Sequence, residues 1–273
     1  MISFPNCKIN LGLNIIRKRE DGYHDLETVF FPIPFIEVLE ILPSDKTEFI
    51  VTGLPLDTTD NLCIKAYNLL KKDYPSLPAI KMHLHKAIPL GAGLGGGSSD
   101  AAFTLLLLNE KFKLDLSTDQ LLNYALKLGS DGPFFIINEP CFATGRGEIL
   151  QPVNVDLRNH KLLLVNPGIH ISTKWAFSNS NPQKPEIPIT QIIAQPIETW
   201  KDRLQNDFEV PVFAEYPEIK EIKTDMYEKG AVYASLSGSG STVYGIFKKD
   251  TTFDIQPHDK YFYKVIDSLD KKI

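Results

Sequence analysis

The sequence predicts an α+β fold, and two features of the chain support this. Segments in which apolar and polar residues alternate come before and between segments with helical periodicity, without the regular spacing of repeated βαβ units. A loop with five glycines in seven positions lies inside the first half and leads into an apolar helix. At 273 residues, the chain can form one large or two medium-sized domains.

The composition is that of an ordinary globular protein, with 43% hydrophobic and 23% charged residues. The formal net charge of −5 argues against a nucleic-acid partner, because such a partner requires a basic face. The N-terminus lacks a signal-peptide pattern, and the most apolar segment, residues 29–42, contains two prolines and two glutamates and cannot span a membrane. We therefore expect a cytoplasmic monomer or homodimer with no membrane partner. The three cysteines are expected to be buried, reduced thiols: Cys7, Cys63 and Cys141.

The N-terminal segment is predicted to form a strand with one polar face. Over residues 8–13, Lys8, Asn10 and Gly12 alternate with apolar residues, so these three share a face. A charged, turn-rich loop is expected over residues 17–28. Further strands are predicted over residues 28–42, 47–52 and 79–90.

Two helices of the first half have recognisable caps. One is amphipathic, begins at Thr59 or Asp60 and runs to Tyr74. The other covers residues 117–129, where Gly129 ends it. Beyond it, short strands and turns are predicted over residues 131–138 and 140–153.

The second half is predicted to begin near residue 152, where a new buried strand and its exit loop follow over residues 160–173. Four prolines indicate an irregular stretch over residues 182–196. The remaining elements are helical segments around residues 198–229 and a final segment over residues 231–247.

The glycine loop is the strongest functional signal in the chain. Glycine accepts positive φ and lets another group approach the main chain closely. A glycine loop that leads into a helix N-terminus presents unpaired N–H groups at the positive end of the helix dipole, which suits a phosphate. The sequence therefore predicts a nucleotide-phosphate site. Its candidate residues are Pro89, Gly91, Gly93, Gly95, Gly96, Gly97, Ser98 and Ser99.

Three other interpretations of this loop are weaker. A Walker A motif requires a lysine before Ser98, where this chain has Gly97. The loop satisfies the dinucleotide-binding fingerprint GxGxxG of the Rossmann fold, and Asp115 follows at a suitable distance. That fingerprint should end a first strand, however, and this loop does not; Asp115 also lies in a short connector. A purely structural loop would not need so many glycines, each of which costs conformational entropy.

The loop P-x-G-x-G-L-G-G-G-S-S resembles the phosphate-binding motif of the GHMP kinases, the galactose, homoserine, mevalonate and phosphomevalonate kinase superfamily. In the form GLGGGSSDAA it is most similar to the branch that phosphorylates the 2-hydroxyl of 4-diphosphocytidyl-2-C-methyl-D-erythritol in the non-mevalonate route to isoprenoid precursors. Alternatives are another kinase of the superfamily, of mevalonate or homoserine type, or a non-catalytic nucleotide-binding relative.

The resemblance implies an architecture of two domains with the active site in the cleft between them. An N-terminal domain like ribosomal protein S5, residues 1–152, would bind the nucleotide, and a C-terminal α+β domain, residues 153–273, would bind the substrate. The resemblance also implies ATP and Mg²⁺, with Ser98 or Ser99 near the metal; a capping role for these serines is equally open. By analogy, Asn61 and Lys86 would approach the nucleotide.

Two residues are candidates for the catalytic step. Taken alone, Asp131 is a helix-end or turn aspartate. The branch that this chain resembles, however, carries GADVPF at this point, with a catalytic aspartate. This chain departs from that motif with Ser130 in place of Ala and Gly132 in place of Val. Lys8, taken alone, is an exposed strand residue. The match of CKINLGL to the family motif K-x-N-L-x-L implies that Lys8 keeps Asp131 ionised and lends positive charge to the transferring phosphoryl group, while Asn10 binds the substrate.

The segment DGYH, residues 21–24, resembles the cytidine-binding segment of the branch, although alone it reads as an Asp-Gly turn. The resemblance implies that Tyr23 stacks on the pyrimidine and that His24 hydrogen-bonds the base. In the segment STKWAF, Phe177 would stack on the opposite face of the pyrimidine, and Thr173 would make a polar contact. Trp175 is the alternative to Phe177 for the stacking role.

Three further motifs carry weaker signals. The segment LSGSGS, residues 236–241, is expected to pack against the first glycine loop. His83 and His85 share one face of a strand, but without a third ligand a metal site is disfavoured. The PxxP spacing over residues 182–188 is interpreted as an irregular loop rather than a ligand for another domain.

Overall fold

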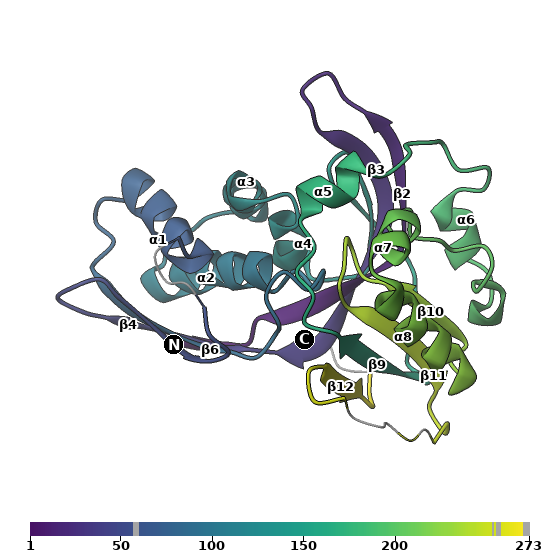
Figure 1. The fold of residues 1–273 in the computed structure, drawn as a ribbon. Coiled ribbons are helices and arrows are strands. Elements are labelled where there is room, and N and C mark those ends of the chain that lie inside the picture. The colour runs from purple at the N-terminus through teal and green to yellow at the C-terminus, as the bar shows by residue number, and fades with distance from the viewer. Residues whose placement is uncertain (57–59, 253, 255–257, 270–273) are drawn as a thin grey trace. The chain divides into compact units, whose positions relative to one another are not determined.

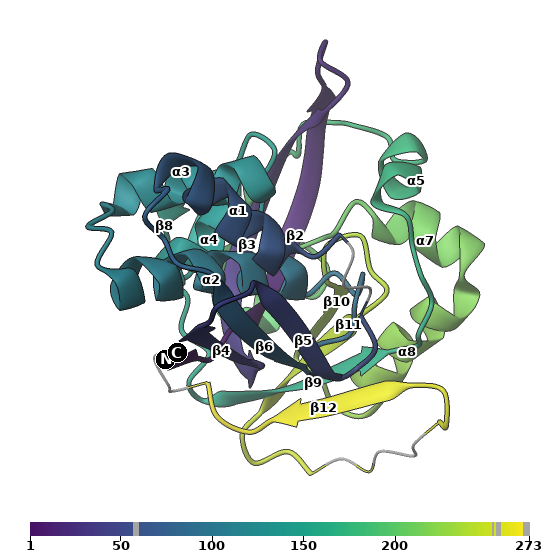
Figure 2. The same cartoon turned by 90° about the vertical axis from the view of Figure 1, so that its left-hand side faces the viewer.

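The computed structural model describes residues 1–56, 60–252, 254 and 258–269, and the chain has the predicted α+β content (Figures 1 and 2). The chain divides into two compact units that alternate along the sequence. Unit 1 consists of Met1–Cys7, Phe35–Leu90 and Gly95–Glu139, and unit 2 of Lys8–Pro34, Gly91–Leu94 and Pro140–Ile273. The units are interleaved along the chain, and a domain boundary near residue 152 stays a prediction.

Unit 1 contains a four-stranded sheet in the order β1-β4-β6-β5. Strands β4 and β6 pair antiparallel, whereas β5 and β6 pair parallel and are joined through helix α1. The bounds are β1 Ile2–Ser3, β4 Val38–Pro43, β5 Glu48–Gly53, β6 Ile80–Lys86 and α1 Leu62–Asp73.

Three further helices of unit 1 are α2 (Gly96–Phe112), α3 (Thr118–Leu128) and α4 (Gly132–Ile137). Helices α1, α2 and α3 cover one face of the sheet (Figure 2). Their buried side chains, among them Leu70 and Leu108, pack against β4 and β6 to form a single apolar core. This core holds helix α2, whose first residues form the end of the glycine loop.

The predicted helix caps of unit 1 are partly right. Helix α3 is capped, as expected: Ser117 and Gln120 form a complete capping box at its start. Helix α1, however, is capped by Asn61, whose side chain accepts a hydrogen bond from the amide of Cys63. The expected cap Asp60 is therefore wrong, and its alternative Thr59 lies outside the described residues.

Residues 131–138 differ from the prediction, because they form helix α4 rather than strands and turns. Pro133 lies in the first turn of the helix, where its missing N–H is not needed. Asn138 ends the helix in the left-handed conformation, with a φ of 54°. The apolar run between them was too short for its periodicity to distinguish helix from strand.

Unit 2 contains two four-stranded sheets, in the orders β2-β3-β7-β8 and β10-β11-β9-β12. Strands β2 and β3 are long and follow each other in the chain, so that the predicted loop over residues 17–28 is reduced to the short turn between them. The bounds are β2 Asn6–Lys18, β3 His24–Ile36, β7 Cys141–Thr144, β8 Ile149–Pro152, β9 His160–Asn166, β10 Tyr233–Leu236, β11 Val243–Lys248 and β12 Phe262–Ile266.

The helices of unit 2 pack on the second of these sheets and beside the β2–β3 pair. Helices α7 and α8 lie against strands β10 and β11 (Figure 1), with Val212 and Met226 in their shared apolar core. Both fall within the predicted helical stretch, whereas α6 lies inside the stretch expected to be irregular. The bounds are α5 Thr173–Ser178, α6 Ile189–Ile193, a 3₁₀ turn Ile197–Thr199, α7 Glu209–Glu215 and α8 Pro217–Glu228.

Two predictions of a general kind can also be compared with the structure. Cys7, Cys63 and Cys141 are buried, as expected, and none of the three forms a disulfide. Among the described residues, no helix is both long enough and apolar enough to cross a membrane.

Candidate active site

The glycine loop leads into helix α2 with an uncapped N-terminus. Gly95 occupies the N-cap position and no side chain of the described residues caps the helix there. The first amide groups of a helix otherwise need a partner from a side chain, water or ligand. They also lie at the positive end of the helix dipole. This terminus is therefore suited to bind an anionic group such as a phosphate.

The preceding part of the loop, Gly91–Leu94, belongs to unit 2 and packs against the second glycine motif, as predicted. Ser237 donates a side-chain hydrogen bond to the carbonyl oxygen of Gly93 at 2.9 Å, and the amide of Thr242 donates to the carbonyl of Ala92 at 3.2 Å. Gly93 has a φ of +78°, and a Cβ atom there would lie 1.9 Å from the carbonyl oxygen of Ser237. The close packing of the two segments therefore requires glycine at position 93.

Lys8 lies in this same packed region and is not the exposed strand residue that its sequence alone suggested. Only 3% of Lys8 is exposed. Its ammonium donates to Asn10 Oδ1 at 2.6 Å and to the carbonyl oxygen of Gly93 at 3.0 Å. Asn10 in turn donates to the hydroxyl of Thr28 at 3.0 Å. Since a buried ammonium is costly without acceptors, these bonds fix its position beside the loop.

Asp131 occupies the N-cap position of α4, but among the described residues its side chain makes no capping hydrogen bond. It is half-buried and directly precedes Gly132. A Cβ atom on Gly132 would lie 2.6 Å from the carbonyl oxygen of Ala125, which leaves no room for the valine of the family pattern. The departure at position 132 therefore matches close packing of α4 on α3.

Ser98, in the first turn of α2, is close to the segment that carries Asp131. Its Oγ is 3.8 Å from the place that a Cβ on Gly129 would occupy, and Ser98, Gly129 and Gly132 line one small crevice. Unit 1 therefore brings the start of α2 and the segment 129–132 together. Ser99, by contrast, is fully buried, and its Oγ has no hydrogen-bond partner among the described residues.

The two aromatic segments proposed for the substrate meet within unit 2. The rings of His24 and Phe177 are stacked, with centroids 4.7 Å apart and planes inclined by 13°. Tyr23 is 53% exposed, and the Arg146 guanidinium lies 4.4 Å from its ring centroid. At 4.7 Å no base fits between His24 and Phe177, so Tyr23 offers the more accessible ring face.

Trp175, the alternative to Phe177, lies in the same helix α5 but contacts a different aromatic ring. Trp175 packs edge-on against Tyr216, at a centroid distance of 5.8 Å, and like Phe177 it packs against the apolar core of unit 2. Thr173, at the start of the helix, lies 3.4 Å from the hydroxyl of Ser239 in the second glycine motif. Phe177 rather than Trp175 therefore lies against the DGYH segment.

His24 is held in its neutral form. Burial, and to a smaller extent the positive charge of Lys18, lowers the pKa of His24 below its ordinary value. At neutral pH its imidazole then has one N–H donor and one nitrogen acceptor. Such a ring can hydrogen-bond the polar edge of a base without adding charge.

Asn61 and Lys86, both expected near the nucleotide, have internal roles in unit 1. Asn61 caps α1. The side chain of Lys86 has no exposed surface, and its ammonium forms ion pairs with Glu37 and Asp100. Sequence reasoning missed both carboxylates, although the strict alternation of buried residues in β6 places Lys86 on its inner face.

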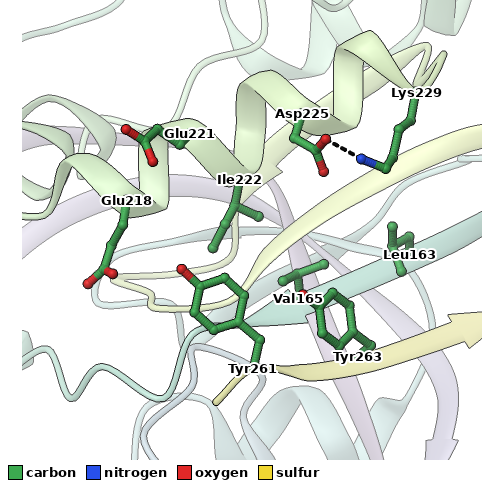
Figure 3. A pocket seen from close by; sticks show the side chains of 9 residues that line it. All are labelled: Leu163, Val165, Glu218, Glu221, Ile222, Asp225, Lys229, Tyr261 and Tyr263. Carbon is green, nitrogen blue, oxygen red and sulfur yellow. Dashed lines mark hydrogen bonds and ion pairs between the residues drawn. The ribbon is translucent and has the colours of Figure 1, made fainter. Parts of the chain in front are cut away.

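Two further features do not involve the predicted site residues. The rings of His83 and His85 both hydrogen-bond the hydroxyl of Thr52, at 2.9 and 3.0 Å. Within the described ranges, no three His, Cys, Asp or Glu residues form a group that could bind a metal ion. A cavity of about 200 Å³ lies between α8 and strands β9 and β12 (Figure 3). Its lining residues are Leu163, Val165, Glu218, Glu221, Ile222, Asp225, Lys229, Tyr261 and Tyr263.

Sequence comparisons match both halves of the chain to one family. The model of the GHMP kinase N-terminal domain matches residues 61–139, and that of the GHMP kinase C-terminal domain matches residues 189–255. A 4-diphosphocytidyl-2-C-methyl-D-erythritol kinase of Azobacteroides pseudotrichonymphae is 54% identical over 91% of this chain and 94% of its own length. The enzyme of that name from Parabacteroides distasonis is 51% identical over 94% of this chain and 95% of its own.

Solved structures agree with this assignment. A crystal structure of a 4-(cytidine 5'-diphospho)-2C-methyl-D-erythritol kinase superimposes with a TM-score of 0.79 at 32% identity, over 90% of each chain. The mevalonate kinase of Methanococcus jannaschii shares the fold, with a TM-score of 0.70 at 15% identity over 97% of this chain and 98% of its own. The chain belongs to the GHMP kinase family, in the branch of the 4-diphosphocytidyl-2-C-methyl-D-erythritol kinases.

Proposed function

We propose that the chain transfers the γ-phosphoryl group of ATP to the 2-hydroxyl of 4-diphosphocytidyl-2-C-methyl-D-erythritol, a step of the non-mevalonate route to isoprenoid precursors. The similarity to kinases of that name extends over nearly the whole chain, at 54% and 51% identity. Among the observations on the structure, the exposed ring of Tyr23 in the DGYH segment carries the choice of substrate. Aromatic faces suit a nucleobase, and neither mevalonate nor homoserine contains one.

The triphosphate is assigned to the glycine loop and the uncapped start of α2. Phosphoryl transfer needs mainly positioning and cancellation of negative charge, and backbone amides at a helix N-terminus provide both. Lys8 supports the same charge, since its ammonium lies 3.0 Å from the carbonyl of Gly93.

Mg²⁺ fits this assignment as an ion held mainly by phosphate oxygens. Proteins usually bind Mg²⁺ through one or two side chains together with substrate phosphates and waters. The half-buried hydroxyl of Ser98 suits that role better than the enclosed hydroxyl of Ser99. When bound, the ion would neutralise charge on the transferring phosphoryl group.

Asp131 is assigned as the group that orients and accepts the proton of the attacking hydroxyl. Asp131 belongs to segment 129–132, which lies beside Ser98 at the start of α2. Lys8 is assigned to keep this carboxylate ionised. Asn10, which Lys8 and Thr28 hold in one orientation, would bind the substrate beside the reacting hydroxyl.

The cytidine is assigned to Tyr23 and His24. Tyr23 offers an accessible ring face, and the neutral imidazole of His24 offers a donor and an acceptor. Phe177 would act by holding His24 in place through ring stacking. Thr173 would make a further polar contact.

A panel of acceptors tests this proposal. The purified chain would be incubated with Mg²⁺, ATP and one alcohol at a time: 4-diphosphocytidyl-2-C-methyl-D-erythritol, mevalonate or homoserine. We expect a new phosphomonoester by ³¹P NMR with the first alcohol alone, and competitive inhibition by CDP. Phosphorylation of mevalonate or homoserine instead, or ADP release that is independent of every acceptor, would reject the substrate assignment.

Replacement of Tyr23 by leucine should raise the KM for the cytidine-linked substrate about tenfold or more, because stacking of a base on an aromatic ring is worth about 1–3 kcal/mol. The KM for ATP should not change. Phe4→Leu is the matched control, since Phe4 is 52% exposed and Tyr23 53% exposed. Steady-state kinetics with both variants would test this, and an equal KM for Tyr23→Leu and the parent chain would remove Tyr23 from the base site.

A further inference from the structure

A fully enclosed group of three charged residues lies in unit 1, and none of the sequence motifs accounts for it. The ammonium of Lys86 is 2.7 Å from Glu37 Oε2 and 2.7 Å from Asp100 Oδ2. The side chains of Lys86 and Glu37 have no exposed surface, and that of Asp100 is 3% exposed. We refer to Glu37, Lys86 and Asp100 as the buried triad.

The buried triad connects the two flanks of the glycine loop. Glu37 Oε1 accepts hydrogen bonds from the amides of Ala87, at 2.9 Å, and Ile88, at 2.7 Å, in the segment that leads into the loop. Asp100 belongs to the second turn of α2, which begins where the loop ends. Through the ammonium of Lys86, the chain before the loop is therefore tied to the helix after it.

Stability alone does not explain such an arrangement. A buried ion pair can often be replaced by apolar side chains without loss of stability, because removing the charges from water is so costly. Burial raises the pKa of Asp100 despite the opposing charge of Lys86, which reflects this cost. Asp100 Oδ1 also lacks a hydrogen-bond partner among the described residues.

The position of the ammonium adds to the cost. Its nitrogen is 3.2 Å from the place that a Cβ on Gly96, the first residue of α2, would occupy. A positive charge beneath a helix N-terminus is repelled by the helix dipole. The carboxylates of Glu37 and Asp100 compensate for this repulsion, so the three residues act as one unit.

We propose that the buried triad positions the glycine loop for the triphosphate: it fixes the segment before the loop and the first turns of α2, so that nucleotide binding does not have to order them. Lys86 then acts through the backbone of the loop and does not itself contact the nucleotide, because its ammonium is enclosed by its two carboxylate partners. This inference rests on the proposed function, in which the loop binds the triphosphate.

Two conservative variants and one control test the proposal. Asp100→Asn and Glu37→Gln each remove one charge with little change in shape, and glutamine at position 37 keeps an oxygen for the two backbone amides. Asn109→Ala is the control, because Asn109 holds the backbone of Leu116 through two hydrogen bonds at the other end of the same helix. For each chain, the melting temperature, the dissociation constant of Mg·ADP by calorimetry and the inhibition constant of CDP would be measured.

We expect the dissociation constant of Mg·ADP to rise roughly ten- to a hundredfold in the triad variants, because small displacements of a positioned group have effects of this size. The inhibition constant of CDP should not change. Asn109→Ala should lower the melting temperature and leave the affinity for Mg·ADP as in the parent chain. Triad variants that weaken nucleotide binding no more than Asn109→Ala would refute the positioning role.

The two proposals fail in distinguishable ways. If the parent chain itself does not bind Mg·ADP or does not phosphorylate the cytidine-linked substrate, the proposed function is wrong. If the parent chain does both and Asp100→Asn and Glu37→Gln behave like Asn109→Ala, only the inference about the buried triad is wrong. Should Asp100→Asn not fold, Glu37→Gln alone decides the question.

Discussion

Replacement of Asp131 by asparagine or alanine is expected to lower kcat by about 10²- to 10⁴-fold, the range for the loss of a positioned acid–base group. The affinity for nucleotide should stay close to that of the parent chain, since the start of α2 would be unchanged. Rapid-quench and steady-state measurements of phosphoryl transfer would separate the chemical step from binding.

A matched carboxylate shows whether this effect is specific. Asp119 is an exposed acidic residue in the first turn of α3, in the same unit as Asp131. Asp119→Asn removes the same charge and should leave kcat unchanged. The assignment of Asp131 as the proton acceptor is untenable if Asp131→Asn turns over as fast as Asp119→Asn.

The sequence was informative where a local signal determines the structure. The amphipathic pattern up to Tyr74, and the cap and final glycine of residues 117–129, predicted helices that the structure contains as α1 and α3. Residues 131–138 were misassigned, because four consecutive apolar residues fit a buried strand or a short helix equally well. Helix α4 packs against α2 and α3, and no local pattern encodes that packing.

Lys86 shows what limits prediction of the site. In β6, Lys86 lies on the same buried face as Met82 and Leu84, which indicates an inward side chain. Resemblance to the family had instead suggested that Lys86 contacts the nucleotide. The two carboxylates that make burial tolerable are 49 and 14 residues away in the sequence. A pairing of this kind depends on tertiary structure, and a single sequence does not contain it.

The aromatic pair illustrates the same limit in a different form. The DGYH and STKWAF segments were both predicted from their own motifs, and the structure brings His24 and Phe177 into contact. The motifs did not indicate which rings would meet, because ring orientation depends on the turn before β3 and on the start of α5. One face of the Tyr23 ring lies against the guanidinium of Arg146, a contact that no motif had indicated.

Gly93→Ala should destabilise the chain by about 3 kcal/mol or more and abolish nucleotide binding, because two costs combine at this position. A φ of +78° is strained for alanine, and the new Cβ would lie 1.9 Å from the carbonyl oxygen of Ser237. Relief of that overlap must move the second glycine motif away from the loop. It would also disturb the carbonyl of Gly93, which accepts hydrogen bonds from Lys8 and Ser237.

A second glycine of the same loop provides a control with the opposite expected sign. Gly97 lies inside α2, and a Cβ there would meet only Leu62 Cδ1, at 3.5 Å. Because alanine restricts the unfolded chain more than glycine, Gly97→Ala should stabilise the fold by about 0.4–1 kcal/mol. Denaturant unfolding of both variants would measure the contrast. Equal free energies of unfolding for Gly93→Ala and Gly97→Ala would mean that the loop does not need glycine at position 93, and that the contact with Ser237 is not what shapes the phosphate site.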